Sequence, residues 1–293
     1  MRSLFLVNER AHKVAKRGSA LRAVADETGT PLVLLDEAFE PRASDDRVYI
    51  EGGDGTVSWV VDRYLQTGRA LPQFAIVPGG TTNQVAGILG LRRKTGKGLA
   101  ASLAEACTPV ACPLIQLSHE GGRESGFVFS TGAIPQVTER LESYRGLADL
   151  SGVALVGRAV IDATRPGSQL LEATPARIEA DLPGEHVVFD GDHTGVIATT
   201  LPSLYLGLDP FWGEQPGRLR VTYADGEARA ILPTILGQWV GRKNLRTLRE
   251  RGFQSFNTER MQVVTDGPVV LDGETLEARD LVLTVSPDVT FVR

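Results

Sequence analysis

The chain has 293 residues, of which 42% are hydrophobic and 23% charged, and its formal net charge is -5. This is ordinary globular composition, and the length suggests two domains or one large one. The acidic balance argues against a surface built throughout to hold nucleic acid, so no nucleic-acid partner is expected.

The cysteine and histidine content argues against a disulfide framework and a zinc site. The only cysteines are Cys107 and Cys112, which form no CxxC pair, and the four histidines are dispersed. A reducing compartment is the simpler interpretation, and we expect a cytoplasmic protein. No stretch approaches the roughly 18 apolar residues of a membrane span, so any membrane contact is expected to be peripheral, at the inner membrane surface.

The first third of the chain alternates short apolar runs with helical spacing. Strands are predicted at residues 4–7, 32–35, 48–50 and 74–77. Helices are predicted at residues 11–26, 57–65 and from residue 84 to 89. This alternation is typical of a parallel sheet with flanking helices, and we predict an α/β domain over residues 1–113.

From about residue 113 the sequence consists of short β-rich runs separated by Gly, Pro and Asp. Strands are predicted at residues 127–129, 186–189, 219–223, 261–264, 269–271 and 281–285. Helical interruptions are predicted at residues 137–142 and 154–163. The pattern favours a second, mostly antiparallel β domain over residues 114–293.

A glycine-rich loop follows the strand predicted at residues 48–50. It consists of Gly52, Gly53, Asp54, Gly55 and Thr56, directly before a helix. Glycines let backbone amides approach a phosphate, and the helix N-terminus adds a positive dipole. Asp54 would repel a phosphate unless a cation stands between them, which makes it a candidate Mg²⁺ ligand. The alternative is a tight turn in which Asp54 caps the helix.

A second loop, Pro-Gly-Gly-Thr-Thr-Asn at residues 78–83, occupies the equivalent place one unit later. Its candidate phosphate-binding residues are Gly79, Gly80, Thr81, Thr82 and Asn83. Both loops should face the carboxyl end of the same sheet, where open α/β sheets bind ligands. The alternative is that Thr82 or Asn83 is a plain helix N-cap. Walker A, GxGxxG and GxSxG motifs are absent.

Three motifs carry a resemblance to a known family. GGDGT at residues 52–56 and PGGTTN at residues 78–83 are followed by Asp272-Gly273-Glu274 near the end of the chain. In order and spacing they resemble the catalytic domain shared by diacylglycerol kinases, sphingosine kinases and their bacterial relatives. NAD kinases share the first motif and the fold.

The resemblance implies an α/β nucleotide-binding domain, a larger β-sandwich domain and a final strand near 286–293 that returns to the first domain. ATP and a lipid would meet in the cleft between the domains. The late DGE turn supplies the general base in this family, here Asp272 or Glu274, with Asp54 as the third catalytic carboxylate. Asn8 matches an early nucleotide-contacting asparagine, although Glu9 and Arg10 replace the usual residues after it.

Two further segments bear on metals and partners. Residues 214–219 resemble a stretch that helps to hold a structural Mg²⁺ in some relatives, but the key carboxylate is missing; Asp209 and Glu214 could offer a different site, and a solvated turn is the simpler interpretation. Basic residues gather at positions 242–251, which suits either a solvated helix or an anionic membrane surface. A homodimer is one possible assembly.

The sequence thus predicts an ATP- and Mg²⁺-dependent lipid kinase acting on a hydroxyl such as that of diacylglycerol. Two alternatives remain at this point. One is an NAD kinase-like enzyme, against which PGGTTN and DGE argue. The other is a non-catalytic lipid-binding regulator that kept the fold, against which the retention of Asp54, Asp272 and Glu274 argues.

Overall fold

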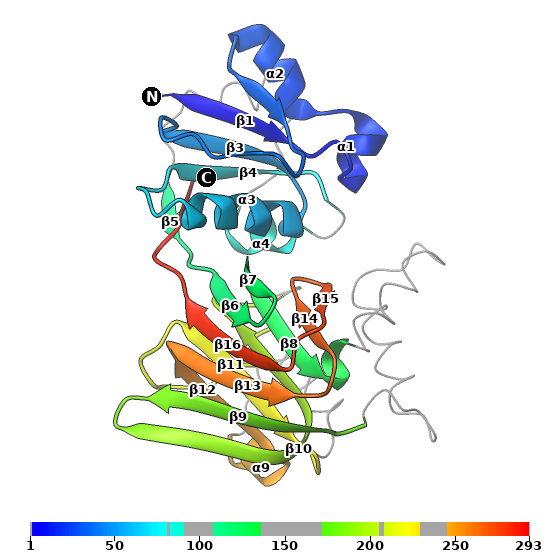
Figure 1. The fold of residues 1–293 in the computed structure, drawn as a ribbon, viewed down its shortest axis with the longest axis vertical. Coiled ribbons are helices and arrows are strands. Elements are labelled where there is room, and N and C mark those ends of the chain that lie inside the picture. The colour runs from blue at the N-terminus through cyan, green and yellow to red at the C-terminus, as the bar shows by residue number, and fades with distance from the viewer. Residues whose placement is uncertain are drawn as a thin grey trace. The chain divides into compact units, whose positions relative to one another are not determined.

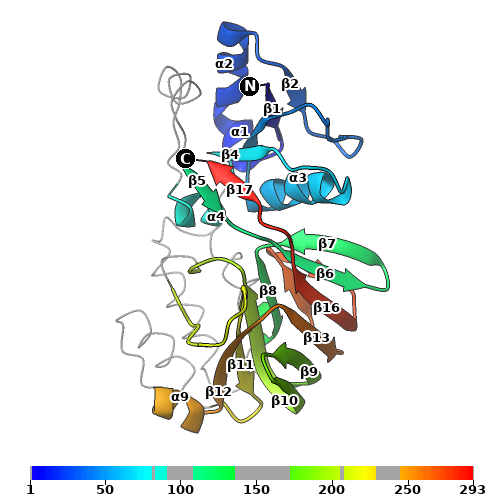
Figure 2. The same ribbon diagram turned by 90° about the vertical axis from the view of Figure 1, so that its left-hand side faces the viewer.

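The computed structural model describes residues 2–80, 83–90, 108–135, 172–204, 208–228 and 245–292. The helices predicted at residues 137–142 and 154–163 lie outside this set. The chain divides into two compact units, one of Met1–Leu114 with Ser286–Arg293 and one of Ile115–Val285. The views of Figures 1 and 2 show the strands and helices of each unit.

The first unit is built on a 6-stranded sheet with the order β2-β1-β3-β4-β17-β5. Its strands are β1 Ser3–Val7, β2 Leu32–Leu34, β3 Arg47–Gly52, β4 Gln73–Pro78, β5 Pro109–Ala111 and β17 Thr290–Val292. The first four strands are parallel, β17 joins β4 in parallel, and β5 pairs antiparallel with β17. The last strand of the chain therefore completes the sheet of the first unit (Figure 2).

Helices cover both faces of this sheet, as near-continuous apolar strands require. They are α1 His12–Arg17, α2 Ala20–Thr28, α3 Asp54–Gln66 and α4 Gln84–Ile88. On one face Phe5 and Tyr49 pack with Leu21 and Val24 of α2. On the other, Tyr64 of α3 meets Phe74 of β4 edge to face, with ring centroids 5.4 Å apart.

The single helix predicted at residues 11–26 is wrong, because the chain breaks between α1 and α2. Gly18 has a φ of 75°, a left-handed value that glycine adopts without strain. Ser19 then caps α2 by accepting a hydrogen bond from the Arg22 backbone amide at 3.0 Å. The α1 helix is thus a separate short element.

The second unit contains an 11-stranded antiparallel sheet. Its strands are β6 Ile115–His119, β7 Gly122–Gly126, β8 Val128–Gly132, β9 Thr174–Leu182, β10 Glu185–Thr199, β11 Leu219–Asp225, β12 Phe253–Thr258, β13 Arg260–Thr265, β14 Val269–Leu271, β15 Glu274–Leu276 and β16 Asp280–Val285. The long β10 pairs with β9 over its first part and with β8 and β11 over its second. A register shift between His193 and Gly195 marks the change of partners.

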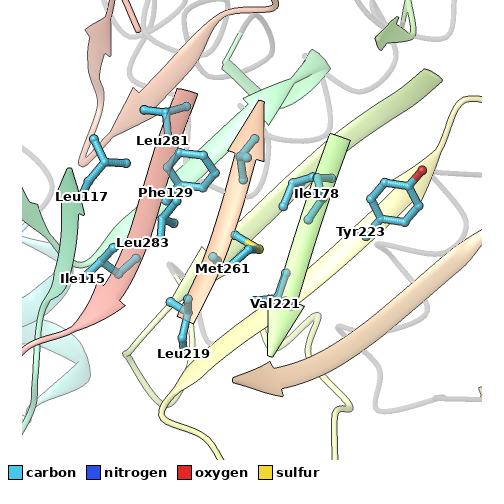
Figure 3. Packing of buried hydrophobic residues seen from close by; sticks show 14 of the residues in the cluster. Ile115, Leu117, Phe129, Ile178, Leu219, Val221, Tyr223, Met261, Leu281 and Leu283 are labelled. Carbon is cyan, nitrogen blue, oxygen red and sulfur yellow. The ribbon is translucent and has the colours of Figure 1, made fainter. Parts of the chain in front are cut away.

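One apolar cluster forms the core of the second unit (Figure 3). It includes Phe129, Ile178, Val221, Met261 and Leu283, all fully buried. These residues come from β8, β9, β11, β13 and β16, so alternate side chains of distant strands meet on one face of the sheet. The short helix α9, Leu245–Glu250, packs against β12.

The fold class predicted from the sequence is confirmed: an α/β unit with a parallel sheet and a larger, mostly antiparallel β unit. The antiparallel strands form a single hydrogen-bonded sheet that curls over its core, because β10 passes from one set of partners to another. Among the described residues, no helix has the length and apolar character needed to cross a membrane.

Candidate functional site

The carboxyl ends of three neighbouring strands place the two glycine loops side by side. Val7 of β1 lies in register with Glu51 of β3, and Gly52 of β3 lies in register with Pro78 of β4. Each loop begins at the last residue of its strand. The edge at which the sequence places both loops is therefore confirmed.

The two loops touch through their backbones. The carbonyl of Gly52 accepts hydrogen bonds from the amides of Gly79 at 2.7 Å and Gly80 at 3.1 Å. A Cβ on Gly80 would overlap the Cα of Gly53, and a Cβ on Gly79 would lie 2.8 Å from Val14. The glycines of the second loop are thus required for loop-to-loop packing, whatever they contact in a ligand.

Asn83 closes the second loop on itself. Its Oδ1 accepts from the Gly80 amide at 2.8 Å, and its Nδ2 donates to the Gly80 carbonyl at 2.7 Å. It adopts a left-handed conformation with a φ of 50°, which Asn tolerates better than most residues. Thr81 and Thr82 lie outside the described residues.

Asp54 links the first loop to the helix that follows the second. Its Oδ2 accepts from the Gln84 amide at 2.8 Å and its Oδ1 from the Val85 amide at 3.0 Å. The carboxylate therefore caps α4. Asp54 itself is the first residue of α3, a different helix. The sequence suggested a cap on its own helix as the alternative to metal binding, and the cap in the structure belongs to the neighbouring helix.

Burial raises the pKa of Asp54 above its ordinary value, whereas the amides of Gln84 and Val85 and the charge of Lys13 oppose that rise in pKa. The carboxylate is thus a partly desolvated anion whose stability depends on donors and cations around it.

Asn8 and Thr56 form a second link across the site. The Asn8 carboxamide donates to Thr56 Oγ1 at 2.8 Å and accepts from the Arg10 amide at 3.0 Å. The Thr56 side chain also fills the space beside Gly52, where an added Cβ would lie 2.6 Å from it. Asn8 therefore orders the first turn of α3 through internal contacts.

The first turn of α3 presents amides at the edge that these links surround. The helix begins at Asp54 after Gly53, and it has no side-chain cap of its own. The first amides of a helix have no partner within it, so they can bind an anion, and the helix dipole favours negative charge there. This arrangement can hold phosphate groups.

In the second unit, Asp272 and Gly273 are the central residues of a two-residue hairpin between β14 and β15. Their φ values of 51° and 94° match the turn that an Asp-Gly pair favours. Asp272 Oδ1 accepts from the amides of Phe127 and Val128, both at 2.9 Å. Glu274, by contrast, opens β15 as an exposed residue. The structure thus gives Asp272 a positioning role within this unit and leaves Glu274 exposed.

The described residues contain no group of three or more His, Cys, Asp or Glu side chains arranged to hold a metal ion. Asp209, considered as a metal ligand, instead pairs with Arg220 at 2.6 Å. Asp54 is the single carboxylate within the two loops.

Two residues of this edge carry no sequence signal that would have identified them. Glu51, directly before the glycines, is fully buried and accepts three hydrogen bonds from residues 19–21. Lys13 donates its backbone amide to the Gly79 carbonyl at 2.8 Å and acts electrostatically on Asp54. The contacts of Glu51 and Lys13 depend on where α1 and α2 lie. The single helix predicted at residues 11–26 did not show the break between those two helices.

The chain is similar to known proteins in sequence family and in fold. Residues 6–112 match the family of the diacylglycerol kinase catalytic domain. A crystal structure of a candidate diacylglycerol kinase from Bacillus anthracis str. Sterne is 18% identical, with a TM-score of 0.62, over 99% of this chain and 96% of that one. A second structure, of a diacylglycerol kinase from the same organism, is 15% identical with a TM-score of 0.59 and the same coverage. These likenesses show a shared fold. No curated protein matches the chain.

Proposed function

We propose that this chain, whose residues 6–112 match the family of the diacylglycerol kinase catalytic domain, is an ATP-dependent lipid kinase. It transfers the γ-phosphoryl group of ATP to a lipid hydroxyl such as that of diacylglycerol. The observation that carries the proposal is the pair of glycine loops locked to each other at the N-terminus of α3.

Phosphoryl transfer suits such a site, because its loose transition state needs positioning and charge stabilisation more than covalent chemistry. In the proposal, amides of Gly53, Gly55 and Thr56 hold phosphate oxygens. Asn8 and Asn83 keep the loops in shape through the contacts described above. The positive end of the α3 dipole offsets negative charge at the phosphates.

Glu274 is proposed as the general base that accepts the proton of the lipid hydroxyl. Its exposed position leaves its carboxylate accessible to a substrate. Asp272 is proposed to position Glu274, because its own carboxylate holds the hairpin to Phe127 and Val128. The sequence alone left the choice between the two carboxylates open.

Mg²⁺ fits this donor set only in part. Asp54 offers carboxylate oxygens, which Mg²⁺ prefers, but each already accepts one amide hydrogen bond. The remaining ligands would come from ATP phosphates and water, as is usual for Mg²⁺ in phosphotransferases. When bound, the ion would neutralise charge on the phosphates.

Peripheral membrane contact is proposed through the basic residues around α9. Arg249 and Arg251 are described together with Arg246, which pairs with Glu250 at 2.8 Å. Arg242 and Lys243 lie outside the described residues. Each basic residue near an anionic bilayer contributes about 1 kcal/mol, and salt weakens the attraction. Vesicle co-sedimentation of a variant with alanine at Arg242, Lys243 and Arg246 tests this patch; unchanged binding would exclude it.

The function itself is tested by measuring ATP turnover against a panel of diacylglycerol, ceramide, sphingosine and monoacylglycerol, with NAD as a further acceptor. We expect a phosphorylated lipid with at least one member of the panel. Turnover with NAD alone would instead establish the NAD kinase-like alternative. Absence of turnover with every acceptor, in a folded protein that binds lipid, would favour the non-catalytic regulator.

A further inference from the structure

A fully buried carboxylate lies directly before the first glycine loop. Glu51 is the residue of β3 that precedes Gly52, and none of its surface is exposed. Its Oε2 accepts from Ser19 Oγ at 2.6 Å and from the Leu21 amide at 3.0 Å, and its Oε1 accepts from the Ala20 amide at 2.9 Å. Burying a carboxylate is costly unless donors surround it, and here three donors do so.

The Glu51 side chain makes more hydrogen bonds to the start of α2 than capping of that helix requires. Ser19 already caps the helix by accepting the Arg22 amide. The Glu51 side chain adds an acceptor from a different element, the central part of the sheet. Its hydrogen bonds therefore fix where α2 begins relative to β3, in addition to satisfying helix amides.

Residue 51 also contacts the start of the segment that runs from residue 8 to residue 21. The Asn8 amide donates to the Glu51 carbonyl at 2.9 Å. Between these ends, the Lys13 amide donates to the Gly79 carbonyl, and Val14 fills the space beside Gly79. Residues 8–21, including α1, are thus tied at both ends to the residue before the first loop and in the middle to the second loop.

We propose that Glu51 is a positioning residue for nucleotide binding, whose carboxylate holds residues 8–21 against both glycine loops and so keeps Asn8 on Thr56. The inference rests on the proposed function, because it assigns the loops to ATP. Glu51 itself acts through the segment and touches no substrate. Loss of the carboxylate frees one end of the segment, and the α1 contact with Gly79 loosens with it.

The test compares Glu51→Gln with the matched control Glu27→Gln, the same change at an exposed residue of α2. Gln keeps one acceptor oxygen, so at least one of the three donors loses its partner. We expect faster hydrogen–deuterium exchange in peptides containing Ala20, Leu21 and Lys13. We also expect the dissociation constant for ATP in the folded variant to rise roughly tenfold, as loss of about one buried hydrogen bond allows. The control should match the wild type in both measurements.

Ser19→Ala provides a milder second variant if Glu51→Gln folds poorly. It removes one donor and leaves the carboxylate with both amides, but it also removes the acceptor of the Arg22 amide. Exchange at Lys13 and ATP affinity, which lie outside that cap, are therefore the two changes to measure, and both should be smaller than in Glu51→Gln. A merely structural Glu51 would lower the melting temperature and speed exchange near Ala20 while ATP affinity stayed constant, and that result would overturn the proposal. Unchanged exchange at Lys13 would also overturn it. Failure of the proposed function is read separately, from wild-type protein that does not bind ATP.

Discussion

Asp54 has a structural role in the glycine loops and a proposed role in the reaction. Its two oxygens hold the first amides of α4, and burial raises its pKa. A raised pKa means that folding disfavours the ionised form of the Asp54 carboxyl. Its contribution to the free energy of unfolding therefore falls as pH rises from the pKa in the unfolded chain through the pKa in the folded protein. The proposed catalytic role offers one reason for keeping a partly buried carboxylate at this position.

Replacing Asp54 with Asn should abolish ATP turnover while the protein stays folded. Asn preserves the size of the side chain and one of the two acceptors, but it removes the negative charge proposed to organise Mg²⁺. Turnover and thermal melting should be measured beside Asp62→Asn, the same change later in α3. Near wild-type turnover of the Asp54 variant would show that its charge has no essential part in the reaction.

The DGE turn should separate into a base and a positioning residue. Glu274→Gln is expected to lower turnover by roughly 10² to 10⁴ with little change in ATP affinity, as for loss of general-base catalysis. Asp272→Asn can keep both amide hydrogen bonds through one oxygen, so its fold should persist. Asp272→Ala leaves two amides without this acceptor and puts Ala at a left-handed φ, which should cost about 1–3 kcal/mol of unfolding free energy.

Chemical denaturation and steady-state kinetics of the three variants check these assignments. Equal losses of ATP affinity and turnover in Glu274→Gln would indicate a nucleotide-binding or structural role in place of a base. An Asp272→Ala variant as stable as Asp272→Asn would remove the positioning role.

The two glycine loops contact each other through the Gly52 carbonyl, which accepts from the Gly79 and Gly80 amides. Gly80→Ala would force the added methyl into Gly53, so we expect a loss of about 1–3 kcal/mol in stability together with weaker ATP binding. Gly87→Ala, in α4, is the control: nothing lies within 4 Å of its added Cβ, and stability should rise by about 0.5–1 kcal/mol. Thermal melting and ATP titration measure both, and equal behaviour of the two variants would contradict the close contact.

The elements that the sequence predicted are those whose signal is local. The buried strands β1, β3 and β4 follow from apolar runs, and the glycine loops follow from their position after those runs. Helical spacing does not show the break between α1 and α2, because it counts apolar positions and not the glycine and capping serine at residues 18 and 19. The contacts of Ser19 with Glu51 and of Asp54 with α4 were missed because their partners lie 30 to 32 residues away.

The second unit contains a buried histidine whose ionisation should couple the stability of the protein to pH. His193 is fully buried, its Nδ1 lies 2.6 Å from the Thr174 carbonyl, and its ring stacks on Tyr223. Because a carbonyl only accepts, Nδ1 carries the proton in this contact. Burial lowers the pKa of His193 below its ordinary value of 6.5. The folded protein therefore holds this imidazole neutral over a range in which the unfolded chain protonates it.

The contribution of His193 should be present above pH 6.5 and be lost as pH falls below that value towards the folded pKa. Its slope is at most about 1.4 kcal/mol of unfolding free energy per pH unit. Denaturation of the wild type and of His193→Gln between pH 5 and 8 gives the free energy of unfolding of each protein as a function of pH. The difference between the two curves is the contribution of His193. Parallel curves would show that His193 does not titrate differently in the folded and unfolded states.

Backbone amide NMR during an ATP titration with Mg²⁺ tests whether the first turn of α3 and the two glycine loops hold the phosphates of ATP. We expect the largest chemical-shift changes on the amides of Gly53, Gly55 and Thr56, with smaller ones at Gly79 and Gly80. Amides of β9 and the first part of β10 should not move and serve as the internal reference. Saturable shifts confined to other residues, or no shifts at millimolar ATP, would contradict the claim.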